Sequence, residues 1–183
     1  MEGYVCKKDG YFGPKGHVLR AGHPSAEHLW VYALAFRLSG DKFLWEMTRK
    51  MAQGNGWGDI GESPQASSRL LLPENISDPR LLFALLELHR ASGNATFLEQ
   101  AEVIGRNILK QRIHNGWFVP SQRHVFCRLA NDEAQALLHL AAALKGQSQA
   151  IPAFTGAQPF FHAEYGTSTG RVYDSADIYG KTQ

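Results

Sequence analysis

The sequence has few of the features that mark several large classes of protein. Its two cysteines, Cys6 and Cys127, fit no metal-binding spacing, and nothing supports a disulfide between them. No apolar run is long enough to span a membrane, and residues 1–10 lack the apolar core of a signal peptide. The 19 Lys and Arg against 17 Asp and Glu give a net charge of +2, without the clustered basic residues of a nucleic-acid binder. We therefore expect no nucleic-acid partner and no membrane span.

Chemical motifs of recognised spacing are missing as well. The chain contains no Gly-rich phosphate loop, no nucleophile elbow and no zinc motif. It does contain enough apolar side chains to bury a core, since 44% of its 183 residues are hydrophobic and 20% are charged. At this length we expect a single domain, residues 1–183.

An internal repeat organises the chain. Apolar runs end at Gly40, Gly93 and Gly146, and both intervals are 53 residues. The segment Ser39–Leu44 aligns with Ser92–Leu98 if one inserted residue is allowed. An apolar run before each Gly and an amphipathic run after it predict a helix, a tight turn and a second helix. Repeats of about 50 residues are typical of stacked helical hairpins.

Two further observations bear on this repeat. Asn55–Trp57 follows the first hairpin and Asn115–Trp117 follows the second, each with the sequence Asn-Gly-Trp. After Gly146, Pro152 interrupts the chain and no second amphipathic helix can be predicted. The chain therefore predicts an open arc of helices, one that lacks its closing units.

The predicted fold class is all-α, with helical hairpins forming an incomplete arc of an α/α barrel or toroid and an aromatic, loop-rich C-terminal segment. Long Gly- and Pro-containing loops, residues 54–77 and 114–130, separate the hairpins, and loops of this length are often functional. The apolar stripe predicted for the second helix is Phe43, Leu44, Met47 and Met51. The predicted helices are His23–Leu38, Asp41–Gln53, Pro79–Ala91, Ala95–Arg112 and Asn131–Leu144.

The first candidate site lies at the start of the first helix. His23 and Glu27 are one turn apart and can share a face, with Arg20 and His28 nearby. A His and Glu pair binds a divalent metal if a third ligand comes from elsewhere. The alternative is a capped helix terminus with solvated polar side chains.

Two other groups could bind a ligand, one a carboxylate and the other a sugar ring. Arg123 and His124 lie on the loop after the second hairpin, and an Arg fork matches a carboxylate; an ordinary charged loop is the alternative. Trp57 and Trp117 could offer flat apolar platforms to sugar rings. Because they occupy repeat-equivalent positions, each could instead plug the end of its own hairpin.

The loops and three short segments of the sequence resemble those of a known family. Helical hairpins joined by Gly-rich, Trp-bearing loops are typical of the α/α-toroid carbohydrate enzymes. Within these, Gly22–Trp30 and the segments Gly170–Asp174 and Tyr179–Thr182 resemble the C-terminal part of family 2 polysaccharide lyases, the bacterial pectate lyases.

The resemblance implies β-elimination on polygalacturonate during pectin catabolism. It further implies a divalent transition metal that neutralises the C6 carboxylate and an Arg that removes the C5 proton, in a closed α/α barrel. Family members are periplasmic, and some are cytoplasmic. The metal ligands and the catalytic Arg are implied to lie in the N-terminal part, outside this chain. We therefore assign no catalytic role to Arg123 or His124, and we expect the isolated chain to be inactive.

Two other functions fit the same pattern. A different α/α-toroid glycan enzyme, such as a glycoside hydrolase or a sugar epimerase, is the first. A hydrolase needs two carboxylates across a cleft, for which Asp59, Glu62, Asp132 and Glu133 are available. The second is a non-catalytic helical-repeat module that binds peptide or protein on its concave surface.

Overall fold

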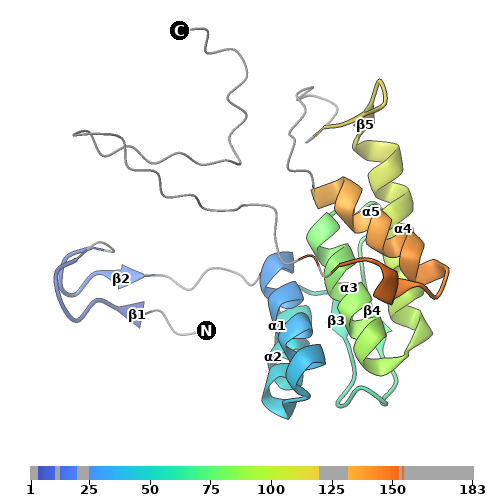
Figure 1. The fold of residues 1–183 in the computed structure, drawn as a ribbon. Helices are drawn as coiled ribbons and strands as arrows, with labels where there is room; N and C mark the ends of the chain where they lie inside the picture. The colour runs from blue at the N-terminus through green and yellow to red at the C-terminus, as the bar shows by residue number, and fades with distance from the viewer. Residues whose placement is uncertain (1–3, 11–12, 20–24, 120–131, 153, 155–183) are drawn as a thin grey trace, which may run out of the picture.

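Helices dominate the part of the chain that the structure, a computed structural model, describes: residues 4–10, 13–19, 25–119, 132–152 and 154. The predicted all-α class is confirmed (Figure 1). The helices are α1 (Ala26–Ser39), α2 (Lys42–Gly54), α3 (Pro79–Ser92), α4 (Ala95–Gln111), α5 (Asp132–Leu144) and a short 3-10 turn, η1 (Ser148–Ala150). The strands form antiparallel pairs, β1 (Tyr4–Val5) with β2 (Val18–Leu19), β3 (Gly58–Asp59) with β4 (Arg69–Leu70), and β5 (Ile113–His114) with β6 (Trp117–Phe118).

The predicted repeat extends to individual hydrogen bonds. Gly40, Gly93 and Gly146 all adopt the left-handed conformation, with φ of 69°, 71° and 66°. In the first two units a Ser hydroxyl before the Gly donates to the carbonyl four residues back, and the residue after the Gly caps the next helix. Those capping residues are Asp41 and Asn94, each accepting from the backbone N–H two residues on. The two turns are therefore the same structure at an interval of 53 residues.

The inserted residue in the predicted alignment is not needed. Thr48, Met51 and Ala52 of α2 are buried, and so are the residues 53 positions later in α4, Ala101, Ile104 and Gly105. The predicted stripe of α2 was also wrong at its start. Phe43 is 59% exposed, whereas Trp45 is buried and donates from Nε1 to the carbonyl of Gly61. The predicted alignment paired Phe43 with Phe97 because both are Phe. The residue of α4 that is equivalent to Phe43 is Thr96.

The helices form two layers. α1 packs against α3 and α3 against α5, while α2 lies behind α1 and α4 behind α3 and α5. The first helix of each hairpin therefore belongs to one layer and the second helix to the other. α3 is the central helix of this arrangement, and every residue from Leu81 to Leu88 is buried. A helix that is buried on all sides must have neighbours on all sides, which α1, α4 and α5 provide.

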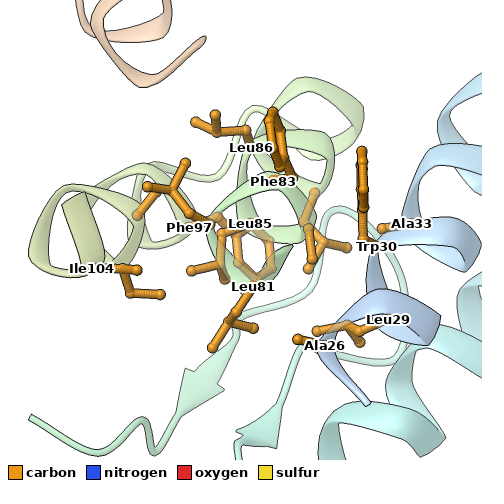
Figure 2. Packing of buried hydrophobic residues seen from close by; sticks show 14 of the residues in the cluster. Ala26, Leu29, Trp30, Ala33, Leu81, Phe83, Leu85, Leu86, Phe97 and Ile104 are labelled. Atoms are coloured by element: carbon orange, nitrogen blue, oxygen red, sulfur yellow. The ribbon is translucent and has the colours of Figure 1, made fainter. Parts of the chain in front are cut away.

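The core lies between α1, α3 and α4. Leu81, Leu85 and Phe97 are at most 1% exposed, and Ile104 is fully buried (Figure 2). The Trp30 ring of α1 stacks on the Phe83 ring of α3, with centroids 4.7 Å apart. These two aromatic residues are also 53 positions apart, so the repeat places equivalent side chains face to face across the layer.

The long loop between α2 and α3 returns along the helices. Asn94 at the far turn donates to the Ser68 hydroxyl over 3.1 Å. Asn107 of α4 donates to the carbonyls of Glu74 and Ile76 at 2.7 and 2.9 Å. Ile60 within the loop is 1% exposed. The loop therefore forms part of the packed structure, although its length alone predicted a functional loop.

Candidate functional site

A row of charged side chains crosses the end of the molecule where α1, α3 and α5 begin. Arg80 of α3 donates from Nη1 to Glu27 of α1 over 2.9 Å, and its Nε lies 3.4 Å from an Asp132 oxygen of α5. All three lie in the first turn of their helices, where carboxylates are favoured by the helix dipole. The row links the three helices of the layer through one shared guanidinium.

The predicted metal ligands of this region have other partners. Glu27 is held by Arg80. The Nδ1 atom of His28 lies 2.7 Å from the Ser25 hydroxyl and also accepts from the Ser25 backbone, which completes a capping box. No group of three or more His, Cys, Asp or Glu side chains is placed to hold a metal within the described residues. Glu27 and His28 therefore have protein partners here, and a metal site that combines them with His23 stays a prediction.

The two Asn-Gly-Trp copies differ in structure. Asn55 ends α2, and Trp57 is half-buried against the core with its backbone bonded to Ala52 and Leu71. Asn115 and Gly116 instead form a tight turn with φ of 49° and 81° between β5 and β6. Two positive φ angles are typical of the hairpin turn that Asn-Gly sequences favour. The repeat in sequence therefore does not extend to this loop.

Trp117 is consequently displayed on the β5–β6 hairpin. It is 65% exposed and pairs across the strands with His114. The base of the hairpin is held beside the start of α3, because the Ser77 hydroxyl bonds to Gln111 over 3.1 Å. An exposed indole on a fixed hairpin offers a free ring face to a ligand. Trp57 has no comparable exposure and stabilises its own hairpin.

Four of the predicted site residues lie outside the described residues, namely Arg20, His23, Arg123 and His124. Their roles remain predictions.

Three of the four carboxylates proposed for hydrolysis are engaged or solvated. Arg49 binds both oxygens of Asp59 at 2.7 Å and holds the pKa of that carboxyl at about 2. The Glu62 side chain is 85% exposed, 3.9 Å from the same Arg49. Asp132 is paired with Arg80. A general acid needs a raised pKa, and Asp59 shows the opposite change.

A buried charged cluster was not foreseen from the sequence. Glu87 of α3 is 8% exposed and accepts from Arg37 of α1 and, over 3.5 Å, from Arg90. The two arginines are repeat-equivalent, 53 residues apart. His139 of α5 lies next to them, and burial, with a smaller effect of Arg90, lowers its pKa. The sequence did carry one signal of this cluster, which is the single acidic residue, Glu87, within the apolar run Leu81–Leu88.

The sequence of the chain was compared with those of known families and proteins. The sequence model of a family described as periplasmic pectate lyase matches residues 1–164. The chain belongs to the periplasmic pectate lyase family. It is 28% identical over 181 residues to a pectate disaccharide-lyase of Dickeya dadantii (strain 3937). That match covers 98% of this chain and 31% of the relative, so the chain spans about a third of the relative's length. The predicted family is therefore confirmed.

Membership of the pectate lyase family also bears on the alternatives. A lyase family does not require a pair of carboxylates across a cleft, which agrees with the engaged carboxylates described above. No helix in the described ranges is both long and apolar enough to cross a membrane.

Proposed function

We propose that this chain is the C-terminal part of a pectate lyase of the α/α-barrel type. Its role is to form part of the barrel wall and to contact the polygalacturonate chain. The metal and the catalytic base belong to the rest of the enzyme. The observation that carries the proposal is the family match over residues 1–164, combined with coverage of 31% of the relative. The charged groups at the start of the helices support a metal and a base located elsewhere, because Glu27 and Asp132 are already paired with Arg80.

The chemistry of the reaction explains why these residues are unsuited to the catalytic step. β-Elimination removes the C5 proton of a galacturonate and breaks the C4–O bond, leaving a C4–C5 double bond in one product. The proton needs a base, and an Arg acts as one only if its pKa is lowered. Arg49 shows the reverse, since its bond to Asp59 raises the pKa of its guanidinium. The family description supports action in the periplasm.

For substrate contact we propose Trp117, with Arg20, Arg123 and His124 as further candidates. Trp117 combines 65% exposure with a fixed backbone, which suits stacking on a sugar ring.

Replacement of Trp117 by Ala tests this role. We expect the affinity for trigalacturonate, measured by calorimetry on the longer enzyme, to fall about 2- to 12-fold, because an aromatic contact contributes roughly 0.5–1.5 kcal/mol. Leu109→Ala is the matched control, since Leu109 is 50% exposed on the adjoining helix. Equal affinities of the native enzyme and both variants would remove Trp117 from the substrate-binding surface.

A further inference from the structure

The tip of the β5–β6 hairpin carries a polar ring beside Trp117. His114 and Trp117 are paired across the two strands, on either side of the turn formed by Asn115 and Gly116. Residues directly opposite each other in an antiparallel pair have their Cβ atoms about 5 Å apart, and both side chains lie on the same face of the ribbon. The imidazole of His114 therefore lies next to the exposed indole of Trp117.

The other face of the ribbon holds the hairpin in place. Ile113 pairs with Phe118, and the Phe118 side chain packs against the hydrophobic core. At the base of the hairpin, the N–H of Val119 donates to the carbonyl of Arg112 over 2.8 Å. The hairpin extends beyond the end of α4 (Figure 1). The rings at its tip are therefore carried on a backbone that the core and the strand pairing keep in position.

The turn residue Asn115 determines which nitrogen of His114 carries the proton. The amide nitrogen of the Asn115 side chain lies 3.3 Å from Nε2 of His114. Because an amide N–H can only donate, Nε2 accepts, and the proton of the neutral imidazole is on Nδ1. No other described side chain bonds to the His114 ring. A ligand at the tip therefore meets an N–H donor beside a flat apolar ring.

The charge of the hairpin suits an anionic ligand. Residues 110–119 contain no Asp or Glu, and Arg112 lies at the base of the hairpin. A galacturonate that stacks on an indole has its C6 carboxylate at the edge of the sugar ring, where a neighbouring side chain can reach it. A carboxylate is a strong acceptor for an N–H donor, and no like charge on this segment opposes it.

We propose that His114 is a specificity residue, which donates from Nδ1 to the C6 carboxylate of the galacturonate unit that stacks on Trp117. Asn115 is the positioning residue that keeps the proton on Nδ1. A methyl ester at C6 is uncharged and accepts a weaker hydrogen bond, so His114 distinguishes acid units of the polymer from esterified ones. The inference rests on the proposed contact between Trp117 and the substrate.

The test compares two ligands that differ only in charge at C6. Calorimetry on the longer enzyme measures the affinities for trigalacturonate and for the same trisaccharide methyl-esterified at all its carboxyl groups, with a metal chelator present to prevent cleavage. His114→Ala should lower the affinity for the acid about 10-fold, as expected for a hydrogen bond to a charged acceptor, and that for the ester less than about 2-fold. His114→Gln keeps an N–H donor and should retain the preference for the acid.

Two further variants separate this role from general effects. Asn115→Gly keeps the positive φ of the turn and removes the amide, so it should narrow the ratio of the two affinities without changing the affinity for the ester. Lys110→Ala removes an exposed positive charge from the adjoining helix and is the matched control; it should leave the ratio within about 2-fold of the native value.

The outcomes distinguish this inference from the contact on which it rests. Trp117→Ala should lower the affinity for both ligands, because both present a sugar ring to the indole. If Trp117→Ala does so while His114→Ala lowers neither affinity, or lowers both equally, the role of His114 is overturned and the Trp117 contact stands. If Trp117→Ala changes neither affinity, the Trp117 contact itself is wrong, and the role of His114 falls with it.

Discussion

The Arg49–Asp59 pair shows how a residue that looks catalytic becomes structural. Asp59 accepts two bonds from Arg49, one from Gln53 and one from the backbone of Gly61. The three bonds from Arg49 and Gln53 join α2 to the start of the loop that follows it, and the bond from Gly61 lies within that loop. An Asp near a Trp in a long loop is a natural candidate for catalysis from sequence, and only the three-dimensional position of Arg49 excludes it.

Acid titration tests this pair. Because the pKa of Asp59 is about 2 in the folded protein and ordinarily 3.8, the unfolded chain takes up its proton first as the pH falls. The stabilisation is therefore complete above about pH 4 and is lost on going down to about pH 2. Asp59→Asn should lower the unfolding midpoint in urea at pH 6 and have a much smaller effect near pH 2. An equal difference at both pH values would contradict the assignment; Glu62→Gln, at a solvated carboxylate, is the control.

His139 should give a second pH dependence, in this case from a basic side chain. Its ring meets Phe83 edge-on, and burial lowers the pKa of the imidazole from 6.5. The neighbouring charges are Arg90, which lowers the pKa further, and Glu87, which raises it. The unfolded chain therefore binds the proton more readily, and folding stability should fall as the pH drops below about 6.5.

His139→Phe keeps a ring at this position and removes the titration. The variant should lose less stability than the native chain between pH 7 and pH 5, measured by urea unfolding at each pH. A native-like loss of stability in the variant would show that another group is responsible.

At the scale of elements, the loop between α2 and α3 tests how much of the molecule is fixed by polar anchors. Asn107 donates to two loop carbonyls, so Asn107→Ala leaves both without this donor. We expect a loss of about 1–2 kcal/mol in the free energy of unfolding and faster amide exchange in residues 71–77.

Lys110→Ala on the same helix is the control for this prediction, because Lys110 is exposed. Unchanged exchange in the loop of Asn107→Ala would mean that apolar contacts such as that of Ile60 hold the loop by themselves.

The elements also show what the sequence could predict. Gly spacing and capping residues predicted all five helices of the described part to within a few residues, because turns and caps are local structures. The course of the loop could not be predicted, since its anchors Asn94 and Asn107 come from another hairpin. The different turns at Asn55 and Asn115 could not be predicted either, because both positions begin the same sequence, Asn-Gly-Trp.

At the scale of the whole molecule, the described helices form two layers. Among the described helices, α1 and α5 are the outer members of one layer, and α3 has a neighbour on each side. The incomplete barrel arc that the sequence predicted is a larger arrangement than these helices and stays a prediction. Contacts across the layer, such as the Arg80 row and the Glu87 cluster, were beyond prediction, because they join residues about 50 positions apart that carry no motif.

The central claim is that this chain is one part of a pectate lyase. The direct measurement is ultraviolet absorbance of the unsaturated product formed from polygalacturonate. It compares the isolated chain of 183 residues with the longest polypeptide encoded in the same reading frame, at equal molar concentration and with a divalent transition metal present. We predict product from the longer polypeptide and none from the isolated chain. Full production by the isolated chain, or reducing ends without a double bond from the longer polypeptide, would contradict the claim.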